Sequence, residues 1–238
     1  MKIDHVVILV QDLAQAMGDY AARGYTVTPG GEHIAGETHN ALVCLADGAY
    51  LELIAFKVPF SKTHRWQRYR AFPGVIDYCL CYESVEVAIQ AANMRGLAYT
   101  FLDNGGRKRP DSVELRWRSG LSPTSTQGLP FMIEDVTLRA LRVPQGAATI
   151  HPNHVVAIAQ LDVLVNDLQR AKQNFDALFG PDVPTMTTAD SLLYDLSGTT
   201  LRLIHPQPKS IEAQLLGGRG VGPHRLHLRR KDGSQVMI

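Results

Sequence analysis

The chain has 238 residues, of which 45% are hydrophobic and 20% are charged. These proportions are typical of a globular protein and exclude a wholly disordered or collagen-like chain. The 24 Lys and Arg residues are balanced by 23 Asp and Glu, which gives a formal net charge of +1. Such a chain has no overall attraction to nucleic acid or to an anionic membrane, so we expect neither as a partner.

Targeting and redox features favour the cytoplasm. The sequence contains no run of about 18 apolar residues, which a transmembrane helix needs. The first residues, MKIDH, lack the pattern of a signal peptide. Cys44, Cys79 and Cys81 are odd in number, and we interpret them as reduced thiols that serve as small core residues. We therefore expect a cytoplasmic protein.

One pattern occurs near both ends of the chain. Residues 3–13 read IDHVVILVQDL and residues 158–168 read IAQLDVLVNDL. In both copies an amphipathic helical pattern follows, with a Gly near its end. Two strand-like runs come next, and in the first copy they are separated by Asp47-Gly48, which is typical of a tight hairpin. Each copy is therefore predicted to fold as β-α-β-β-β.

A weaker third copy begins with VIDYCLCYES at Val75 and continues with the helical pattern VEVAIQAANMRGL. The predicted fold class is therefore α+β, with three β-α-β-β-β modules of which the first two pair around a cleft. The polar end of the chain, RRKDGSQVMI, is expected to be mobile. The predicted units are a paired-module unit over 1–145 (modules 1–56 and 74–136), a third module over 146–207 and a C-terminal extension over 208–238.

Paired modules of this kind resemble the vicinal-oxygen-chelate superfamily, which includes glyoxalase I, extradiol dioxygenases and bleomycin-resistance proteins. The similarity is greatest to bacterial glyoxalase-like domain proteins. It extends over most of residues 1–206. The segments that carry it are IDHVVILVQDL at 3–13, THNALVCLADGAYLELIAF at 38–56, RPDSVELRWR at 109–118, LPFMIED at 129–135 and HPNH at 151–154.

The resemblance implies a divalent metal ion bound in the cleft by the first and last strands of each module. Carried over to this sequence, His5 takes the first-strand position of module one and Glu52 the last-strand position. Imidazole and carboxylate ligands suit Zn, Ni, Mn or Fe and leave room for a substrate. From the residues alone, His5 could instead be a hydrogen-bonded core histidine and Glu52 an outward-facing strand residue.

Modules two and three depart from the pattern. Module two offers Tyr78 at the first-strand position and Met132 or Glu134 near the last strand. We expect Tyr78 to contact a substrate and Glu134 to act as a base or further ligand. Module three offers Gln160 and Arg202, and the positive charge of an arginine repels a metal ion. No pair of modules therefore shows four clean ligands.

Further polar residues are candidates for the cleft. His39, at the entrance to a strand, is predicted to contact the substrate, although His39-Asn40 could also be turn chemistry. Strand alternation places Arg116 and Arg118 on one face and Trp117 on the other. If the Trp117 face packs on a helix, both arginines face the cleft and bind an anionic substrate. A solvated basic face is the alternative.

The favoured function is a divalent-metal-dependent lyase, isomerase or dioxygenase that acts on a small organic molecule. In this hypothesis the ion polarises substrate oxygens, Glu52 or Glu134 serves as base, and Arg116 and Arg118 orient the anion. The alternative is a metal-free protein that binds or sequesters a small molecule in the same cleft. The odd third module must cover its sheet, either by packing on the first unit or by pairing with its counterpart in a second chain, and we also predict a homodimer.

Overall fold

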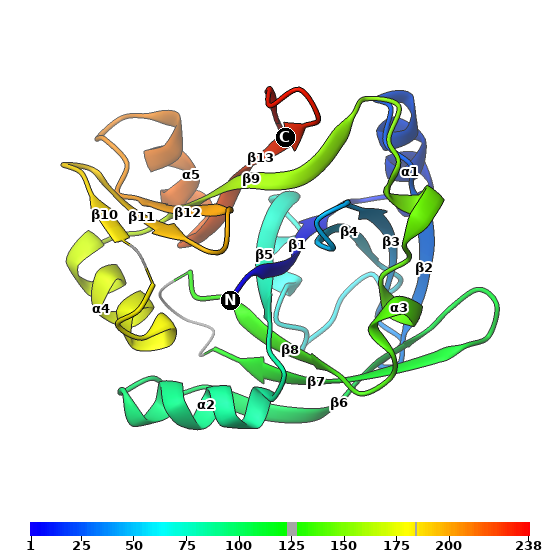
Figure 1. Ribbon diagram of the computed structural model, residues 1–238, viewed down its shortest axis with the longest axis horizontal. Coiled ribbons are helices and arrows are strands. Elements are labelled where there is room, and N and C mark those ends of the chain that lie inside the picture. The colour runs from blue at the N-terminus through cyan, green and yellow to red at the C-terminus, as the bar shows by residue number, and fades with distance from the viewer. Residues whose placement is uncertain (123–127, 184) are drawn as a thin grey trace.

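A closed eight-stranded barrel and an open six-stranded sheet make up the computed structural model of the chain, which describes residues 1–122, 128–183 and 185–238. Figure 1 shows the barrel on one side of the molecule and the open sheet, with its helices α4 and α5, on the other. This is the predicted α+β fold, with the first two modules paired around one cavity.

The barrel is built from the first two modules, and its strand order is β1-β4-β3-β2-β6-β7-β8-β5. In each module the first and last strands pair in parallel, and antiparallel pairs β1–β5 and β2–β6 join the modules. Module one comprises β1 (Ile3–Leu9), α1 (Leu13–Ala22), β2 (Thr28–His33), β3 (Thr38–Cys44) and β4 (Tyr50–Phe56). Module two comprises β5 (Gly74–Cys81), α2 (Val85–Met94), β6 (Thr100–Lys108), β7 (Glu114–Leu121) and β8 (Phe131–Asp135).

Local sequence signals account for the boundaries of these elements. The Asp12 carboxylate accepts a hydrogen bond from the amide of Gln15 (2.9 Å) and caps α1, because the first amides of a helix have no partner within it. Between β3 and β4, Gly48 adopts φ +84°, a conformation that favours glycine. The predicted hairpin at Asp47-Gly48 is thereby confirmed.

The third module and the chain end form the open sheet, whose order is β10-β11-β12-β9-β13-β14. Its β9 pairs in parallel with β12 and antiparallel with β13, as β1 pairs with β4 and β5. The expectation of a mobile end is wrong, because β14 completes the sheet on β13. The elements are β9 (Val155–Leu164), α4 (Leu168–Phe179), β10 (Thr185–Thr187), β11 (Ser191–Asp195), β12 (Thr200–Ile204), α5 (Ile211–Arg219), β13 (Gly222–Arg230) and β14 (Gln235–Met237).

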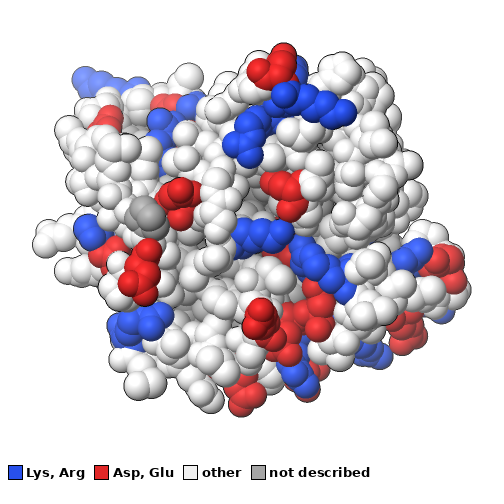
Figure 2. Space-filling model, viewed as in Figure 1, with Lys and Arg blue, Asp and Glu red and all other residues white. Residues whose placement is uncertain are grey.

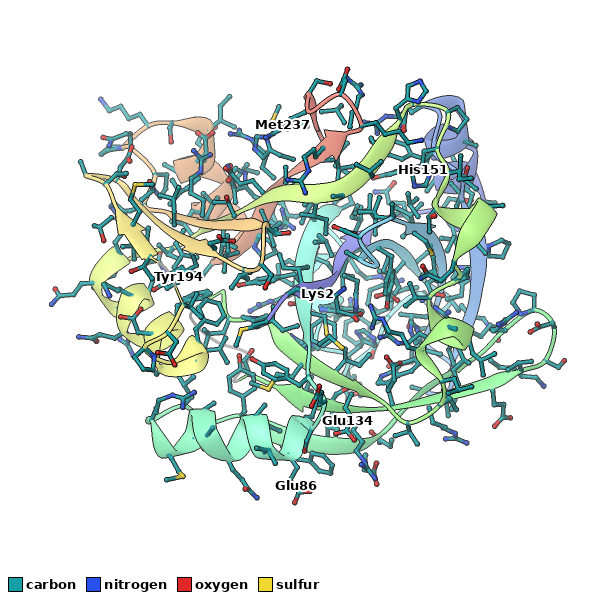
Figure 3. All side chains as sticks on the ribbon, in the orientation of Figure 1. Lys2, Glu86, Glu134, His151, Tyr194 and Met237 are labelled. Carbon is teal, nitrogen blue, oxygen red and sulfur yellow. The ribbon has the colours of Figure 1, made fainter. Side chains whose placement is uncertain are left out.

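Apolar side chains on the outside of the barrel join the two parts into one core. Tyr78 and Leu80 lie on the outer face of β5, against which β13 packs. They belong to the same buried cluster as Phe175 and Tyr194 of the open-sheet part. Figure 3 shows Tyr194 beside α4. The linker between the parts carries the short helix α3 (Arg139–Arg142) and a single-turn helix at Gly146–Thr149. Another single-turn helix lies at Gln67–Tyr69, between β4 and β5.

His151 ties the linker to the barrel. Its Nδ1 accepts a hydrogen bond from the amide of Thr26 (3.0 Å), and its Nε2 donates to the carbonyl of Cys44 (2.9 Å). Both ring nitrogens of this buried side chain are therefore engaged in holding the linker, so the HPNH segment is a connector.

The surface charge and the helix lengths agree with the near-zero net charge and with the lack of a long apolar run in the sequence. On the face shown in Figure 2, acidic and basic side chains are intermingled. Within the described residues, every helix is too short or too polar to span a bilayer. Cys44, Cys79 and Cys81 are free thiols, and burial raises the pKa of each.

Candidate active site in the barrel

A cavity of about 300 Å³ lies inside the barrel. A group of polar residues on it comes from five consecutive strands of the barrel order, and its apolar wall comes from the next two strands and from the segment 57–73, here called the strap. The polar group, called the polar arc, consists of His5 (β1), Glu52 (β4), Asn40 (β3), His33 (β2) and Arg107 (β6). Further polar lining residues come from β7, α3 and the strap: Ser119, Arg142, Thr63, His64 and Arg65. The apolar wall includes Trp117 (β7), Phe131 (β8) and Trp66 (strap).

Glu52 is the centre of the polar arc and is almost completely buried. Its Oε1 accepts a short hydrogen bond from Asn40 Nδ2 (2.6 Å) and lies 3.5 Å from His33 Nε2. Its Oε2 lies 3.6 Å from His5 Nε2, which is beyond hydrogen-bonding distance. Two imidazole nitrogens from different strands thus approach the two oxygens of one carboxylate.

The protonation states follow from burial and neighbouring charges. Burial by itself raises the pKa of Glu52, but the charges of His33 and His5 and the Asn40 hydrogen bond outweigh it, so the pKa lies below its usual value. Burial lowers the pKa of His33, more than the Glu52 charge raises it. At neutral pH the site therefore holds an ionised Glu52 and a neutral His33, the histidine form that accepts protons and binds metals.

A buried ion network fixes the orientation of His5. Asp4 is fully buried, and its Oδ1 accepts from His5 Nδ1 (2.7 Å) and from Arg142 Nη1 (2.8 Å). Because an ionised carboxylate only accepts hydrogen bonds, Nδ1 of His5 donates to Asp4, and this bond holds the ring with Nε2 toward Glu52. Arg142 in turn forms a two-bond pair with Asp135 (2.5 and 2.8 Å) and donates to Tyr50 Oη (2.8 Å).

The strap contributes Trp66 to the cavity and is fastened by Asp77 of β5. Trp66 Nε1 donates to Asp77 Oδ2 (2.7 Å), and Arg65 Nη2 forms an ion pair with the same oxygen (2.7 Å). The Arg65 guanidinium also lies over the ring of Phe131, 5.1 Å from its centroid. Asp77 is therefore the attachment point that keeps Trp66 against the apolar wall.

Replacing Asp77 with Asn is expected to loosen the strap. The amide removes the ion pair with Arg65 and one acceptor, so the free energy of unfolding should fall by about 1–3 kcal/mol. Acrylamide quenching of tryptophan fluorescence should increase, because Trp66 becomes more accessible. Asp103→Asn is the control, since Asp103 pairs with Arg118 on the surface. Equal quenching in both variants and the unaltered protein would show that Asp77 does not hold the strap.

The structure places some of the sequence-predicted residues in the cavity and others outside it. His5 and Glu52 line the cavity. His39 lies between two inward-facing residues of β3 and faces away, since side chains alternate along a strand. Tyr78 also lies outside, where its hydroxyl donates to the carbonyl of Gly128 (2.9 Å). Neither side chain reaches a molecule in the cavity.

The predicted faces of β7 are reversed in the structure. Trp117 faces the cavity, so Arg116 and Arg118 face outward. Arg118 forms ion pairs with Asp103 (3.1 Å) and Glu134 (2.9 Å). Glu134, labelled in Figure 3, also accepts from the amide of Val85 at the start of α2 (2.9 Å). These three residues stabilise the outside of the barrel and take no part in the cavity.

Three members of the polar arc were missed from the sequence: His33, Asn40 and Arg107. The position of Asn40 could have been predicted. It is two residues from the apolar Leu42, so strand alternation puts it on the same, inward face of β3. Arg107 lies in the basic run GGRKR at 105–109, shortly before Arg116 and Arg118 in the chain. Its inward direction depends on the irregular register of β6 between Leu102 and Gly105.

Comparison with known proteins assigns the chain to a family. A model of the glyoxalase-like domain matches residues 3–179. The chain belongs to this family. The resemblance seen in the sequence is thus confirmed, whereas a search among curated proteins found no match.

Solved structures share the fold of this glyoxalase-like protein. A hypothetical protein from Staphylococcus aureus matches with a TM-score of 0.70 and 13% identity, over 87% of this chain and 86% of that chain. A mutant 4-hydroxymandelate synthase from Streptomyces coelicolor matches with a TM-score of 0.57 and 15% identity, over 96% of this chain and 70% of that chain. A xylose isomerase-like TIM barrel/4-hydroxyphenylpyruvate dioxygenase fusion protein has the same TM-score, with 14% identity, over 96% of this chain and 36% of that one. At these identities the matches show the fold alone.

The resemblance implies a divalent metal ion, and the donors of the cavity meet this requirement in kind but not in number. The chemistry fits: an imidazole positioned by a carboxylate is the usual arrangement of a metal-binding histidine, and His5 has it through Asp4. The number of donors is small, since within the described residues no group of three or more His, Cys, Asp and Glu could hold an ion. An ion on His5 and Glu52 would therefore take its other ligands from substrate or water.

Proposed function

We propose that the barrel cavity is the active site of a divalent-metal-dependent enzyme that acts on a small organic molecule, with His5 and Glu52 as the protein donors. The observation that supports this proposal is the alignment of Asp4, His5 and Glu52. The Asp4 hydrogen bond directs His5 Nε2 toward a buried carboxylate oxygen at 3.6 Å, a distance suited to two atoms that share a cation.

When bound, the ion would polarise substrate oxygens and stabilise an enolate as a Lewis acid. The other residues of the polar arc have separate roles. His33 Nδ1 lies 2.9 Å from Thr38 Oγ1, and donation in that direction leaves Nε2 free to accept a proton from the substrate. Asn40 holds Glu52 in place through its short hydrogen bond. Glu134, paired outside the barrel, does not serve as the base.

The reaction class we propose is that of a lyase, an isomerase or a dioxygenase. These reactions share one requirement. A substrate oxygen must bind to a metal ion that has open coordination positions, close to the atom that gains or loses a proton or reacts with oxygen. The partly buried imidazole of His33, which is neutral at neutral pH, supplies the proton-transfer group for the first two. The three free thiols fit a reducing compartment, so the cytoplasm stays our prediction.

Calorimetric titration of the chelator-treated protein with Mn²⁺, Ni²⁺, Zn²⁺ and Fe²⁺ tests the proposal. We expect at least one ion to bind with a stoichiometry of one per chain. If none of the four ions binds, or if they bind only at several weak sites, the proposal is contradicted.

A metal-free binding or sequestering protein is the second candidate. It is favoured by the small number of protein donors and by Arg107, whose positive charge lies on the same cavity and opposes that of a metal ion. The same titration separates the two candidates, because a metal-free binding protein would bind none of the four ions in its cavity.

We also predict a homodimer formed through the open sheet. Strands β10 and β14 are its edges, and Met186 on β10, Ile211 on α5 and Met237 on β14 are exposed apolar residues of this part of the molecule. Light scattering should give twice the mass of one chain, and the double variant Met186→Lys with Met237→Lys should give the mass of one. Met94→Lys on α2 is the matched control, and a single-chain mass for the unaltered protein would contradict the prediction.

A further inference from the structure

The two buried arginines of the site differ in their partners. Arg142 faces two carboxylates, Asp4 and Asp135, and donates to both. Arg107 is 2% exposed, and within the described part of the chain it forms no ion pair, although the charge of Glu52 acts on it. One guanidinium is therefore fully paired inside the barrel, and the other is not.

The contacts of Arg107 are few for a buried guanidinium. Its Nη2 donates to the carbonyl of Arg142 (2.8 Å), and its Nη1 makes a long contact with Asn40 Oδ1 (3.4 Å). Its buried Nε has no hydrogen-bond partner within the described part of the chain. A buried charge is costly unless a counter-charge and hydrogen-bond acceptors surround it, so Arg107 is suited to an anionic group that enters the cavity.

The opposite side of the cavity is aromatic. Trp117, Phe131 and Trp66 line it, and the rings of Trp66 and Phe131 lie 6.3 Å apart. Arg65 lies over these two rings, but its charge is already paired with Asp77 (2.7 Å). Gly105 makes room for this wall, because a Cβ at that position would come within 2.2 Å of Trp117 Nε1. Flat rings around a cavity of about 300 Å³ favour a small planar molecule, which aromatic side chains bind by stacked or edge-on contact.

We infer that the cavity binds a small aromatic carboxylate, with its anionic group on Arg107 and its ring against the wall formed by Trp66, Trp117 and Phe131. This inference rests on the proposed role of the cavity as the substrate site, but it does not depend on the metal ion. The anion-binding group is then Arg107 and not Arg116 or Arg118, which face outward. The substrate class is then one that combines a planar ring with a single negative charge.

Intrinsic fluorescence provides the test, since the chain has two tryptophans and both line the cavity. The probes are phenylacetate, its uncharged analogue phenylacetamide, and acetate, which has the charge without the ring. We expect phenylacetate to change the fluorescence and to bind about 10- to 100-fold more tightly than phenylacetamide, as a charged hydrogen bond predicts. Acetate should bind more weakly than phenylacetate.

Variants assign the preference to one residue. Arg107→Gln should abolish the preference for the acid over the amide, and Arg107→Lys should retain part of it. Arg116→Gln is the matched control, because this arginine lies outside the cavity, and it should behave like the unaltered protein. Thermal unfolding of each variant shows whether it is folded. If Arg107→Gln does not fold, Arg107→Lys and the acid–amide comparison in the unaltered protein decide the result.

The inference and the proposed metal site fail in different ways. Titrations in chelator should still show the preference for the acid, because Arg107 and not an ion holds the carboxylate. If phenylacetate binds only after an ion is added and Arg107→Gln binds it normally, the inference is overturned while the metal site stands. Equal affinity for acid and amide, or no binding of either at millimolar concentration, also overturns it.

Discussion

Replacing Arg142 with Met is expected to lower the free energy of unfolding by about 3 kcal/mol, because it removes the buried cation that pairs with both Asp4 and Asp135 and leaves them only the partly exposed Arg139. Arg142 is 1% exposed and donates to Asp4, to Asp135 and to the hydroxyl of Tyr50. Asp4 has no exposed surface, so water cannot replace the lost hydrogen bonds. Chemical unfolding followed by circular dichroism measures the change.

Acid sensitivity gives a second readout of the same variant. Burial raises the pKa of Asp4, but the Arg142 charge and the His5 hydrogen bond lower it well below the usual value of 3.8. The unfolded chain therefore binds this proton at higher pH than the folded one does. The stability from Asp4 is complete above that usual pKa and is lost as the pH falls through the folded pKa. Without Arg142, the largest influence that lowers the pKa of Asp4 is lost while burial still raises it, so acid unfolding should begin at higher pH.

The control for this prediction is Arg116→Met. Arg116 is an exposed residue of β7 whose only ion pair, among the described residues, is with the exposed Glu114 at 3.4 Å. Such surface pairs contribute up to about 1 kcal/mol, so this variant should unfold nearly as the unaltered protein does. If Arg142→Met and Arg116→Met have the same stability, the Asp4–Arg142–Asp135 network does not hold the barrel together.

Replacing Glu52 with Gln is expected to lower the affinity for the divalent ion at least about 100-fold, because loss of a supporting group alone costs 10- to 100-fold and Glu52 is a proposed direct donor. The amide has nearly the shape of the carboxylate and can still accept the Asn40 hydrogen bond. The fold should therefore survive, and the change should affect the ion and not the barrel. Calorimetric titration measures the affinity.

Glu134→Gln is the matched control. This residue is also a glutamate at the end of a module, but it pairs with Arg118 and with the amide of Val85 outside the cavity. Its variant should bind the ion as the unaltered protein does. Equal loss in both variants would indicate a general effect on folding, and no loss in Glu52→Gln would remove Glu52 from the site.

The sequence predicted the fold and two residues of the candidate site, His5 and Glu52, because these depend on repeated local patterns. The period-two apolar runs, the helix caps and the Asp47-Gly48 hairpin each identify one element. His5 and Glu52 follow from the module pattern, since β1 and β4 are parallel neighbours in the barrel. His5 and Glu52 are not paired directly, because Val7 is the residue of β1 opposite Glu52. The side chains of His5 and Glu52 nevertheless reach the same cavity.

Residue-level errors arose where one residue of register decides the direction of a side chain. An offset of 73 aligns the Ile-Asp steps of modules one and two and brings Tyr78 to the position of His5. In the ladder, however, His5 lies opposite Cys79, and Tyr78 faces the other side of β5. A shift of one residue reverses every side chain of a strand, and sequence similarity this weak does not fix the register.

The faces of β7 depended on where a helix packs. Helix α2 covers the outer face of the strand only at its end, where a Cβ on Gly120 would touch Ile89. Arg116 and Arg118 share that face and extend beyond the helix, so they reach solvent. Alternation alone therefore gave the two faces of the strand correctly but not which one was inside.

Elemental analysis of the untagged protein by mass spectrometry tests the central claim, that His5 and Glu52 bind a divalent ion in the barrel. Unaltered protein, Glu52→Gln and Glu134→Gln would be incubated with Zn²⁺, Ni²⁺, Mn²⁺ and Fe²⁺ and then desalted. The account predicts close to one equivalent of one ion in the unaltered protein and in Glu134→Gln, and almost none in Glu52→Gln. An unaltered protein without metal, or a Glu52→Gln variant with the full equivalent, would contradict it.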